Sequence, residues 1–259
     1  MVTWMKSVLR WRELVLILAQ RNLKVRYKGS ALGFFWSLLA PLFMILIYAV
    51  FLRVMLSFDS SPLFLPRLVT GIVCWQFLAL CVGDSMNTVL GSASLVKKTT
   101  FPRLVLPAAM VLANTVNFLL SAVVLVIYLL LAPGTMAAWG WFPVVLAFHI
   151  ALCMGLGSLF SALNVHYRDT EHAGAVFMMA WFFLSPVIYT IDRIPEALRP
   201  FAYLNPMTGI LTAYRQILLS EPGPDPFWCY ALSALVCALA LCIGLRVFSR
   251  LQRTFAEAL

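Results

Sequence analysis

The stretch RNLKVRYKGSALGFFWSLLAPL, residues 21–42, holds four cations within eight positions and then becomes a run of Leu, Phe and Trp. Lysines and arginines beside an apolar segment hold that end of it on the cytoplasmic side of a membrane. Gly29 and Ser30 follow the cations directly and favour a break in the helix, because glycine has few backbone restrictions. The stretch therefore predicts a helix at the membrane surface that turns at Gly29 into a first membrane span.

The composition extends this prediction to the whole chain. Of the 259 residues, 63% are hydrophobic and 11% are charged, against about 45–50% and about 25% in soluble domains. The net charge of +9 would favour a nucleic-acid-binding protein only if the cations shared a soluble basic face. They lie instead at the ends of apolar segments, so we predict an integral membrane protein with no nucleic-acid partner.

Six apolar segments reach the length of about 20 residues that crosses a bilayer. They are 33–53, 68–90, 104–131, 142–164, 173–190 and 227–247. Residues 200–219 are long enough as well, but they include two prolines, Asn205 and Arg215, and a charge at mid-membrane costs at least about 2.5–3.5 kcal/mol. The sequence thus predicts an all-α fold with six transmembrane helices and short re-entrant outer gate helices between spans five and six.

The distribution of charge predicts the orientation. With six spans, the N-terminus, the loops 91–103 and 164–172 and the C-terminus share one side and carry 14 of the 19 Lys and Arg. Both termini are therefore predicted to be cytoplasmic. No cleavable signal peptide is predicted, because about 30 residues precede the first long apolar segment. We expect one transmembrane domain, 1–259, made of an interface helix (1–30), spans one to five (33–190), an outer re-entrant segment (191–226), span six (227–247) and a cytoplasmic tail (248–259).

Residues 4–28 have the pattern of an amphipathic helix that lies on the membrane. Apolar side chains recur at three- and four-residue spacing while the cations favour the other side. The apolar positions are Trp4, Val8, Trp11, Val15 and Leu18. The alternative is a solvated leader that only sets orientation.

Two features inside the predicted spans are candidates for function. Trp36, Phe43 and Phe51 fall at intervals of seven and eight residues near one helical face, where they either pack or line a path. Asp84 is the only acidic residue well inside a span and cannot cheaply face lipid. It is expected to face a partner helix, a cavity or the inner interface, and a structural hydrogen bond explains it as well as a functional role.

Two short loops lie on the predicted cytoplasmic side. Residues 91–107 are basic and broken by Pro102 and Pro107, which predicts a short helix followed by an elbow. Residues 164–173 carry charges of both signs and suit either a docking edge or a tight turn.

Catalytic constellations are scarce in the sequence. It has no GxxxxGK[ST] loop for ATP phosphates, no HExxH and no GxSxG. The six cysteines form no CxxC pair and fall within predicted spans, so no metal site is predicted. Any work done by this chain is expected to draw its energy from another subunit.

The order of these features resembles the membrane subunits of type-2 ABC exporters (ABC-2 permeases), and among them the polysaccharide-export permeases of O-antigen, capsule and teichoic acid systems. Four stretches carry the likeness: RNLKVRYKGSALGFFWSLLAPL (21–42), LVKKTTFPRLVLP (95–107), NVHYRDTEHA (164–173) and LNPMTGILTAYRQILL (204–219). The chain is most similar to an O-antigen exporter permease. The resemblance implies a homodimer in the bacterial inner membrane, paired with two copies of a P-loop ATP-binding subunit that holds ATP and Mg²⁺. It also implies a channel for a polyprenyl-diphosphate-linked glycan, contact with membrane lipids, and no cofactor on this chain.

The same resemblance implies roles for individual residues, none of them catalytic. ATPase coupling would fall to Gly91, Ser92, Ala93, Ser94, Leu95, Val96, Lys97 and Lys98, and to Tyr167, Arg168 and Asp169. A cytoplasmic gate would comprise Thr99, Thr100, Phe101, Pro102 and Arg103, and an outer gate Asn205, Pro206, Tyr214 and Arg215. Aromatic side chains lining the channel would be Trp36, Phe43, Phe51, Trp181, Phe182 and Tyr189. The cations Arg21, Lys24, Arg26 and Lys28 would either attract the lipid diphosphate or only set topology.

The mechanistic hypothesis is that closure of the ATPase dimer pushes on 91–103 and 164–172 and thereby moves the first and fifth spans. An export permease for teichoic acid, capsule, another lipid or a drug is the nearest alternative. A membrane-embedded polyprenyl-sugar enzyme would want acidic residues at the outer surface, where only Asp192, Glu196, Glu221 and Asp225 are available. A non-transporting scaffold of the same composition is the third alternative, and the signature loops argue against it.

Overall fold

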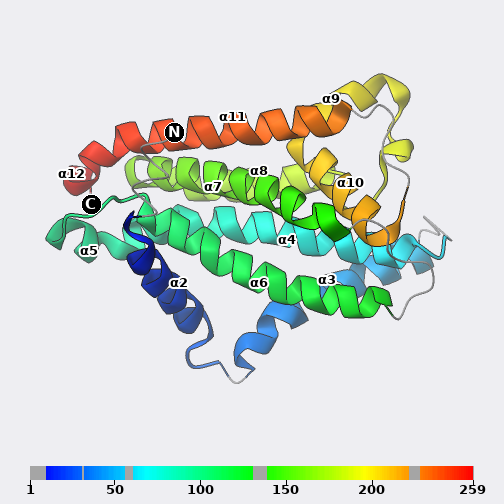
Figure 1. Ribbon diagram of the computed structural model, residues 1–259, viewed down its shortest axis with the longest axis horizontal. Helices are drawn as coiled ribbons and strands as arrows, with labels where there is room; N and C mark the ends of the chain where they lie inside the picture. Colours follow the sequence, from blue (N-terminus) through cyan, green and yellow to red (C-terminus); the bar gives the residue numbers. More distant parts are fainter. Residues whose placement is uncertain (1–9, 31, 56–60, 131–138, 222–227, 259) are drawn as a thin grey trace.

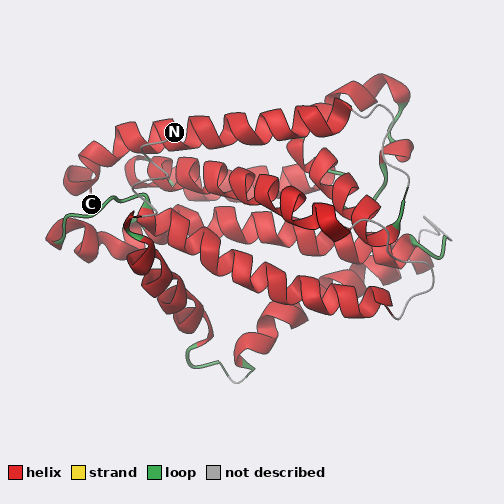
Figure 2. Ribbon diagram, in the orientation of Figure 1, coloured by secondary structure: helices red, strands yellow, loops and turns green. Residues whose placement is uncertain are grey.

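The computed structural model describes residues 10–30, 32–55, 61–130, 139–221 and 228–258, and the regular elements in these ranges are all helices (Figure 2). In chain order the α-helices are α2 (Arg12–Tyr27), α3 (Trp36–Ala49), α4 (Phe64–Thr88), α5 (Ala93–Lys98), α6 (Val105–Leu130), α7 (Phe142–His166), α8 (Asp169–Leu184), α9 (Arg199–Leu204), α10 (Pro206–Leu219), α11 (Trp228–Leu251) and α12 (Phe255–Ala258). Short helical turns join several of them: η1 (Gly33–Phe35), the π-helical η2 (Val50–Met55), η3 (Leu90–Ser92), η4 (Trp139–Trp141), η5 (Ile191–Arg193), η6 (Glu196–Leu198) and η7 (Gln252–Thr254). The all-α prediction is confirmed for the described residues.

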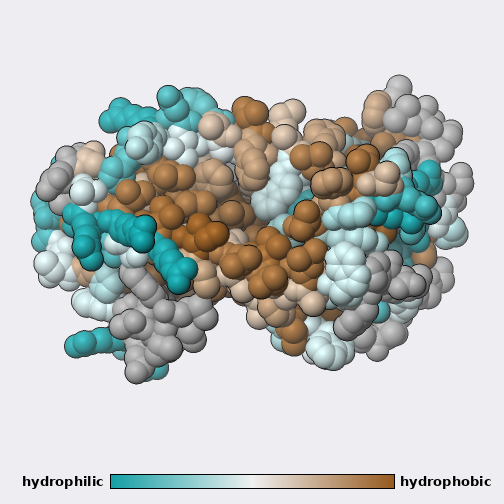
Figure 3. Space-filling view, turned by 90° about the horizontal axis from the view of Figure 1, so that it is seen from above, coloured by the Kyte–Doolittle hydropathy of each residue, from teal (hydrophilic) through white to brown (hydrophobic). Residues whose placement is uncertain are grey.

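Four long helices, α4, α6, α7 and α11, run alongside one another and form the body of the molecule (Figure 1). Helix α4 is the innermost: it contacts α3, α6, α7, α8 and α10, and Leu78, Cys81 and Val82 on it are fully buried. The other long helices turn large apolar side chains outward. Figure 3 shows such side chains across the middle of one face, with hydrophilic side chains toward the two ends. An apolar surface of this extent requires a lipid environment rather than water.

Within the described residues, four helices are long and apolar enough to cross a membrane. They are Phe64–Thr88, Val105–Leu129, Trp139–His166 and Trp228–Thr254. These four correspond to the predicted spans two, three, four and six.

The predicted first and fifth spans differ from the expectation. Helix α3 has 14 residues and continues as the wider turn η2. Helix α8 has 16 residues, which is about 24 Å at 1.5 Å per residue, against about 30 Å for the hydrocarbon core. It ends at Leu184 instead of 190, because Pro186 disfavours a helical conformation at the residue before it.

One end of the bundle holds both the beginning of α2 and the end of the chain. A cluster of buried apolar side chains joins Val15 and Leu18 of α2 to Val105 of α6 and to Phe248 and Phe255 near the C-terminus. Helix α5 lies at this end as well, whereas α9 and α10 lie at the other end (Figure 1). The two loops predicted to be cytoplasmic and the predicted outer gate are therefore separated by the length of the bundle.

The segment predicted to be re-entrant forms α9 and α10 at that opposite end. Pro206 occupies the first turn of α10, where its missing N–H costs nothing. Met207, Leu211 and Leu218 are buried, and α10 packs against α4, α7 and α11. The segment is thus wedged between the long helices. Residues 222–226, the end of the predicted outer segment, lie outside the described residues.

Candidate functional site

The junction between α2 and α3 breaks where the sequence predicts it. Gly29 has a φ of +79°, a left-handed conformation that residues with a side chain rarely adopt. Ser30 Oγ accepts a hydrogen bond of 3.1 Å from the Gly33 N–H, which supports the turn into η1. On α2, Val15 and Leu18 are buried as predicted, whereas Trp11 is exposed. The predicted positions Trp4 and Val8 lie outside the described residues.

Arg26 stands apart from the other three cations of the junction because it reaches into the bundle. Its guanidinium donates to the Asp84 carboxylate of α4 in an ion pair, and the Arg26 and Asp84 side chains are 26% and 30% exposed. Asn114 Nδ2 of α6 donates to the same carboxylate oxygen at 2.9 Å. A single carboxylate therefore joins α2, α4 and α6, which gives Asp84 the partners that the sequence predicts it needs. The remaining cations are exposed: Arg21, Lys24 and Lys28.

The first predicted coupling element is a short helix, α5, that follows α4 through η3. Val96 is buried while Lys97 and Lys98 are exposed, so α5 packs on the bundle and presents its cations outward. Thr99 Oγ1 donates to the Leu95 carbonyl at 2.6 Å, which closes the helix ahead of the turn at Pro102. The predicted helix and elbow are both present, and their coupling role stays a prediction.

The second predicted coupling element is the tight connection between α7 and α8. Helix α7 ends at His166 and α8 begins at Asp169. Asn164 Nδ2 donates to the Met86 carbonyl at 3.0 Å, and Asn87 Nδ2 donates to Glu171 Oε1 at 2.9 Å. The end of α4, which leads into α5, is thus hydrogen-bonded both to the end of α7 and to the start of α8. The exposed residues presented here are Tyr167, Arg168 and Asp169.

The predicted cytoplasmic gate ends in a contact that the sequence does not predict. The Arg103 guanidinium donates to the Gln252 carbonyl and lies 5.9 Å from the centre of the Phe255 ring. The tail predicted to begin at residue 248 therefore folds back onto the bundle. The available signal was Phe255 itself, the one aromatic residue in the final ten, RLQRTFAEAL.

The aromatic side chains predicted in the first span face away from the subunit. Trp36, Phe43 and Phe51 are 47%, 54% and 47% exposed. Other large apolar side chains of α3, such as Leu46 and Ile47, are exposed as well. Much of the surface of α3 is therefore free to contact lipid, a second subunit or a cargo.

The aromatic residues predicted in the fifth span divide into two groups. Phe182 is 8% exposed and packs within the subunit, with ring centres 5.7 Å from Tyr48 and 5.6 Å from Trp75, so the prediction that it lines a channel does not fit the structure. Trp181 and Tyr189 are half-buried. Helical spacing alone placed Phe182 on the free face, because it carries no information on how α3 and α4 cover α8.

Asn205, the first predicted outer-gate residue, ties the start of α10 to the end of α8. Its Oδ1 accepts from the Met207 N–H at 3.0 Å as an N-cap and also from Trp181 Nε1 at 3.0 Å. Its Nδ2 donates to Ser185 Oγ at 2.9 Å. The oxygen and the nitrogen of the Asn205 amide thus both form hydrogen bonds that connect the start of α10 with the end of α8.

Arg215, a buried residue of α10, likewise ties this helix to the residues that follow α8. It is 4% exposed, and its two terminal nitrogens donate to the carbonyls of Val187 at 2.8 Å and Tyr189 at 3.0 Å. These carbonyls follow the end of α8 and would otherwise be unpaired in an apolar setting, which costs free energy. Gly71 of α4 allows the approach, because a Cβ there would lie 2.2 Å from the Val187 oxygen. The adjoining Tyr214 is fully buried.

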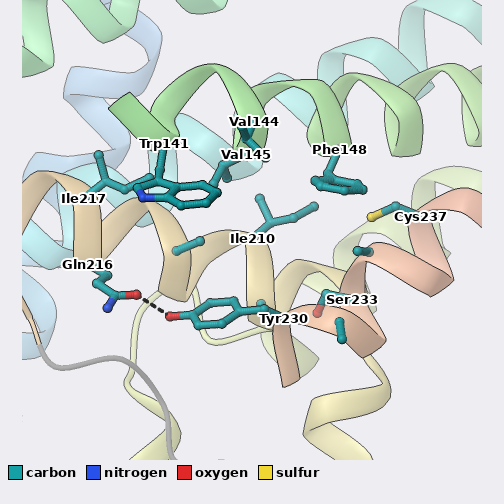
Figure 4. A pocket seen from close by; sticks show the side chains of 14 residues that line it. Trp141, Val144, Val145, Phe148, Ile210, Gln216, Ile217, Tyr230, Ser233 and Cys237 are labelled. Atoms are coloured by element: carbon teal, nitrogen blue, oxygen red, sulfur yellow. Dashed lines mark hydrogen bonds between the residues drawn. The ribbon is translucent and has the colours of Figure 1, made fainter. Parts of the chain in front are cut away.

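A cavity of about 560 Å³ lies between α7, α10 and α11, near the same end (Figure 4). Its walls are mainly apolar, including Phe148 and Ile210, and the Tyr230 hydroxyl donates to Gln216 Oε1 at 2.6 Å along one side. A hydrocarbon chain fits such walls, whereas a hydrated or sugar-like cargo would lose hydrogen bonds there. The cavity therefore suits an apolar group better than a hydrophilic one. In the described part of the chain, no three His, Cys, Asp or Glu side chains are grouped to hold a metal ion.

The geometry thus defines a helical membrane protein in which two short loops at one end of the bundle are hydrogen-bonded to the end of α4 or packed on it. Comparison with known proteins places the chain in a class of membrane proteins as well. Residues 13–219 match the ABC-2 type transporter family, and the chain belongs to that family. The O-antigen export system permease protein RfbA of Myxococcus xanthus is 31% identical over 263 residues and covers 100% of both chains. Two proteins of the same name from Klebsiella pneumoniae are each 28% identical over 250 residues, covering 95% of both chains.

Proposed function

We propose that this chain is the channel-forming membrane subunit of an ATP-driven exporter that moves a polyprenyl-diphosphate-linked polysaccharide, O-antigen above all, across the bacterial cytoplasmic membrane. The observation that carries the proposal is the end-to-end likeness to proteins named O-antigen export permeases. As an ABC-2 transporter, the chain is a transport component rather than an enzyme. ATP and Mg²⁺ would bind a separate P-loop subunit.

We infer six spans, with α3 and α8 added to the four long helices. Each of these shorter helices would be completed by the irregular residues beside it, η2 after α3 and 185–190 after α8. The end that carries α5 would then be cytoplasmic, together with both termini. Its exposed cations support this orientation, because Lys and Arg near spans favour the cytoplasmic side; they include Lys97, Lys98, Arg168 and Arg253.

The channel would form between two copies of the chain. The outward faces of Trp36, Phe43 and Phe51 support this arrangement, because side chains that already face away from one subunit can line a path only beside another. Phe182 is left out of the proposed lining. Aromatic rings suit a glycan, since their flat faces stack on sugar rings.

The ATP-binding subunit would dock on α5 and on Tyr167–Asp169 of each copy. The hydrogen bonds through Asn87 and Asn164 support this, because they brace both elements on the end of α4. Helix α2 would lie at the cytoplasmic membrane interface. Since Arg26 is engaged by Asp84, attraction of the lipid diphosphate would fall to the exposed cations Arg21, Lys24 and Lys28.

Deletion of the gene is the direct test. Surface polysaccharide should be lost and the lipid-linked glycan should accumulate inside, and the wild-type gene should restore export. A Lys97→Glu, Lys98→Glu variant should insert normally yet fail to restore export, because its reversed charges face the ATPase. Unchanged surface polysaccharide after deletion would refute the proposal.

The cationic junction has its own test. Charge reversal of Arg21 and Lys24 together should reduce export if the cations attract the lipid diphosphate, with insertion checked by protease accessibility of the loops. Normal export by a correctly inserted variant would leave these cations with a topological role only.

A further inference from the structure

Residues Gln252–Ala258, here called the C-terminal plug, form a compact unit that packs on the end of the bundle that carries α5. After α11, the chain continues as η7 and α12, and α12 contacts both α5 and α7. Phe255 is fully buried, and its ring packs perpendicular to the Phe248 ring with centres 5.4 Å apart. An isolated helix of four residues is not stable in water, so α12 depends on these contacts for its structure.

The plug connects to the side of the first coupling element through Arg103. The Arg103 guanidinium donates to the Gln252 carbonyl and lies over the Phe255 ring. Arg103 lies in the connection between α5 and α6. Its planar cation therefore holds that connection against η7 with both a hydrogen bond and a cation–π contact.

The plug connects equally to the second coupling element. His166 Nε2 lies 2.8 Å from Thr254 Oγ1, and its ring centre is 5.9 Å from that of Phe255. His166 is the last residue of α7 and immediately precedes Tyr167. Arg103, beside the first element, and His166, beside the second, are more than 60 residues apart in sequence. Arg103 contacts Gln252, His166 contacts Thr254, and both contact Phe255.

We propose that the segment Gln252–Ala258 is a third part of the surface on which the ATP-binding subunit docks, and that it fixes α5 and the Tyr167–Asp169 turn in one rigid unit. This inference rests on the function proposed above. Its buried side, Phe255, sets the spacing of the two coupling elements. Its exposed side adds the cation Arg253 beside them.

The charges of this composite surface define the partner's chemistry. Among the side chains that the structure describes on it, exposed cations come from all three segments, namely Lys97, Lys98, Arg168 and Arg253, and the exposed acids are Asp169 and Glu171. A facing surface of the ATP-binding subunit should therefore be acidic, since complementary charges set both the association rate and the register of docking. An acidic side chain in place of Arg253 should weaken docking on an acidic partner surface and leave the fold intact, because the Arg253 side chain is exposed.

The docking test compares Arg253→Glu with Arg246→Glu in the full-length chain. Arg246 is also exposed and lies two helical turns earlier on α11, so it controls for the charge change itself. Each variant is purified in lipid nanodiscs, and its affinity for the P-loop subunit of the same exporter is measured. Arg253→Glu should bind about tenfold more weakly, with the difference shrinking at high salt, while Arg246→Glu should bind as the wild type does.

The rigid-unit test uses Thr254→Val, which keeps the side-chain volume and removes the hydroxyl that meets His166. It should leave ATPase affinity nearly unchanged and raise the ATP hydrolysed per glycan exported by at least about twofold, because the two coupling elements no longer move together. A wild-type chain that fails to bind the P-loop subunit would refute the proposed function. A wild-type chain that binds, together with an Arg253→Glu variant of equal affinity or a Thr254→Val variant of unchanged stoichiometry, would overturn this inference alone.

Discussion

Separating Arg26 from Asp84 should weaken the attachment of the end of α2 to the bundle. The perturbation is a double-mutant cycle of Arg26→Gln, Asp84→Asn and the two combined. Asn has the shape of Asp, and Gln is a shorter, uncharged polar side chain in place of Arg. In the single variant Arg26→Gln, the Asp84 carboxylate keeps only the hydrogen bond from Asn114. The combined variant removes both charges and so leaves no unpaired ion.

The magnitude follows from how far the pair is buried. Exposed ion pairs contribute about 0.2–1 kcal/mol, whereas loss of one partner from a fully buried pair costs about 3–5 kcal/mol. With side chains 26% and 30% exposed, this pair lies between the two limits. Polar contacts between membrane helices reach about 1.7 kcal/mol. We therefore expect a coupling energy of about 1–2 kcal/mol between the two substitutions.

The assay is unfolding of the purified chain in mixed micelles of increasing SDS content, followed by tryptophan fluorescence. Arg26→Gln should lower the free energy of unfolding by about 2 kcal/mol, and the double variant should lose less than the two single variants together. Arg21→Gln, an exposed cation on the same helix, is the control and should change little. A coupling energy below about 0.5 kcal/mol, within the usual error of additivity, would show that the pair does not hold α2.

Three further predictions concern the outer segment and the aromatic residues. Gly71→Ala places a Cβ against the Val187 carbonyl and should cost about 1–3 kcal/mol in the same unfolding assay; a neutral result would mean that this contact is looser than described. Asn205→Ala removes the N-cap of α10 and should cost about 1–2 kcal/mol, with Asn205→Asp retaining most of the stability; equal losses would argue against the cap. Phe182→Ala should cost about 3 kcal/mol because the side chain is buried, whereas Phe43→Ala should leave stability within about 1 kcal/mol and reduce export; the reverse ranking would contradict the assignment of these two residues.

The helices could be predicted from the sequence because apolar length and local breakers determine most of them. Four of the six predicted spans are present as long helices, and Gly29 marks a break where it was expected. The end of α8 was placed six residues too late, at 190. The apolar run continues past Pro186, and hydropathy does not register the backbone effect of proline on the residue before it.

The candidate site was predictable only in its local parts. The short helix α5 and its elbow follow from the spacing of Lys97, Lys98 and Pro102, all within one segment. The pairing of Arg26 with Asp84 spans 58 positions and depends on how α2 crosses α6, which no local pattern encodes. The sequence did identify one member of the pair, because Asp84 is the only carboxylate well inside a predicted span and needs a partner. The fold-back of Phe255 had even less signal, one aromatic residue in a polar tail.

The ion pair determines how a displacement at the end of the bundle that carries α5 would be transmitted. Helix α5 follows α4 after a single short turn, and Asp84 lies on the last turn but one of α4. In the proposed mechanism, a displacement of α5 therefore moves the Asp84 carboxylate, and through Arg26 it moves the end of α2 that turns into α3. Without the ion pair, α2 would not follow the displacement of Asp84. With the ion pair, α2 moves with α4 and displaces α3, the helix that carries Trp36 and Phe43. The Arg26→Gln, Asp84→Asn double variant tests this route, because it should fold and bind the ATPase yet export less glycan per ATP hydrolysed; export at the wild-type ratio would exclude α2 as the link.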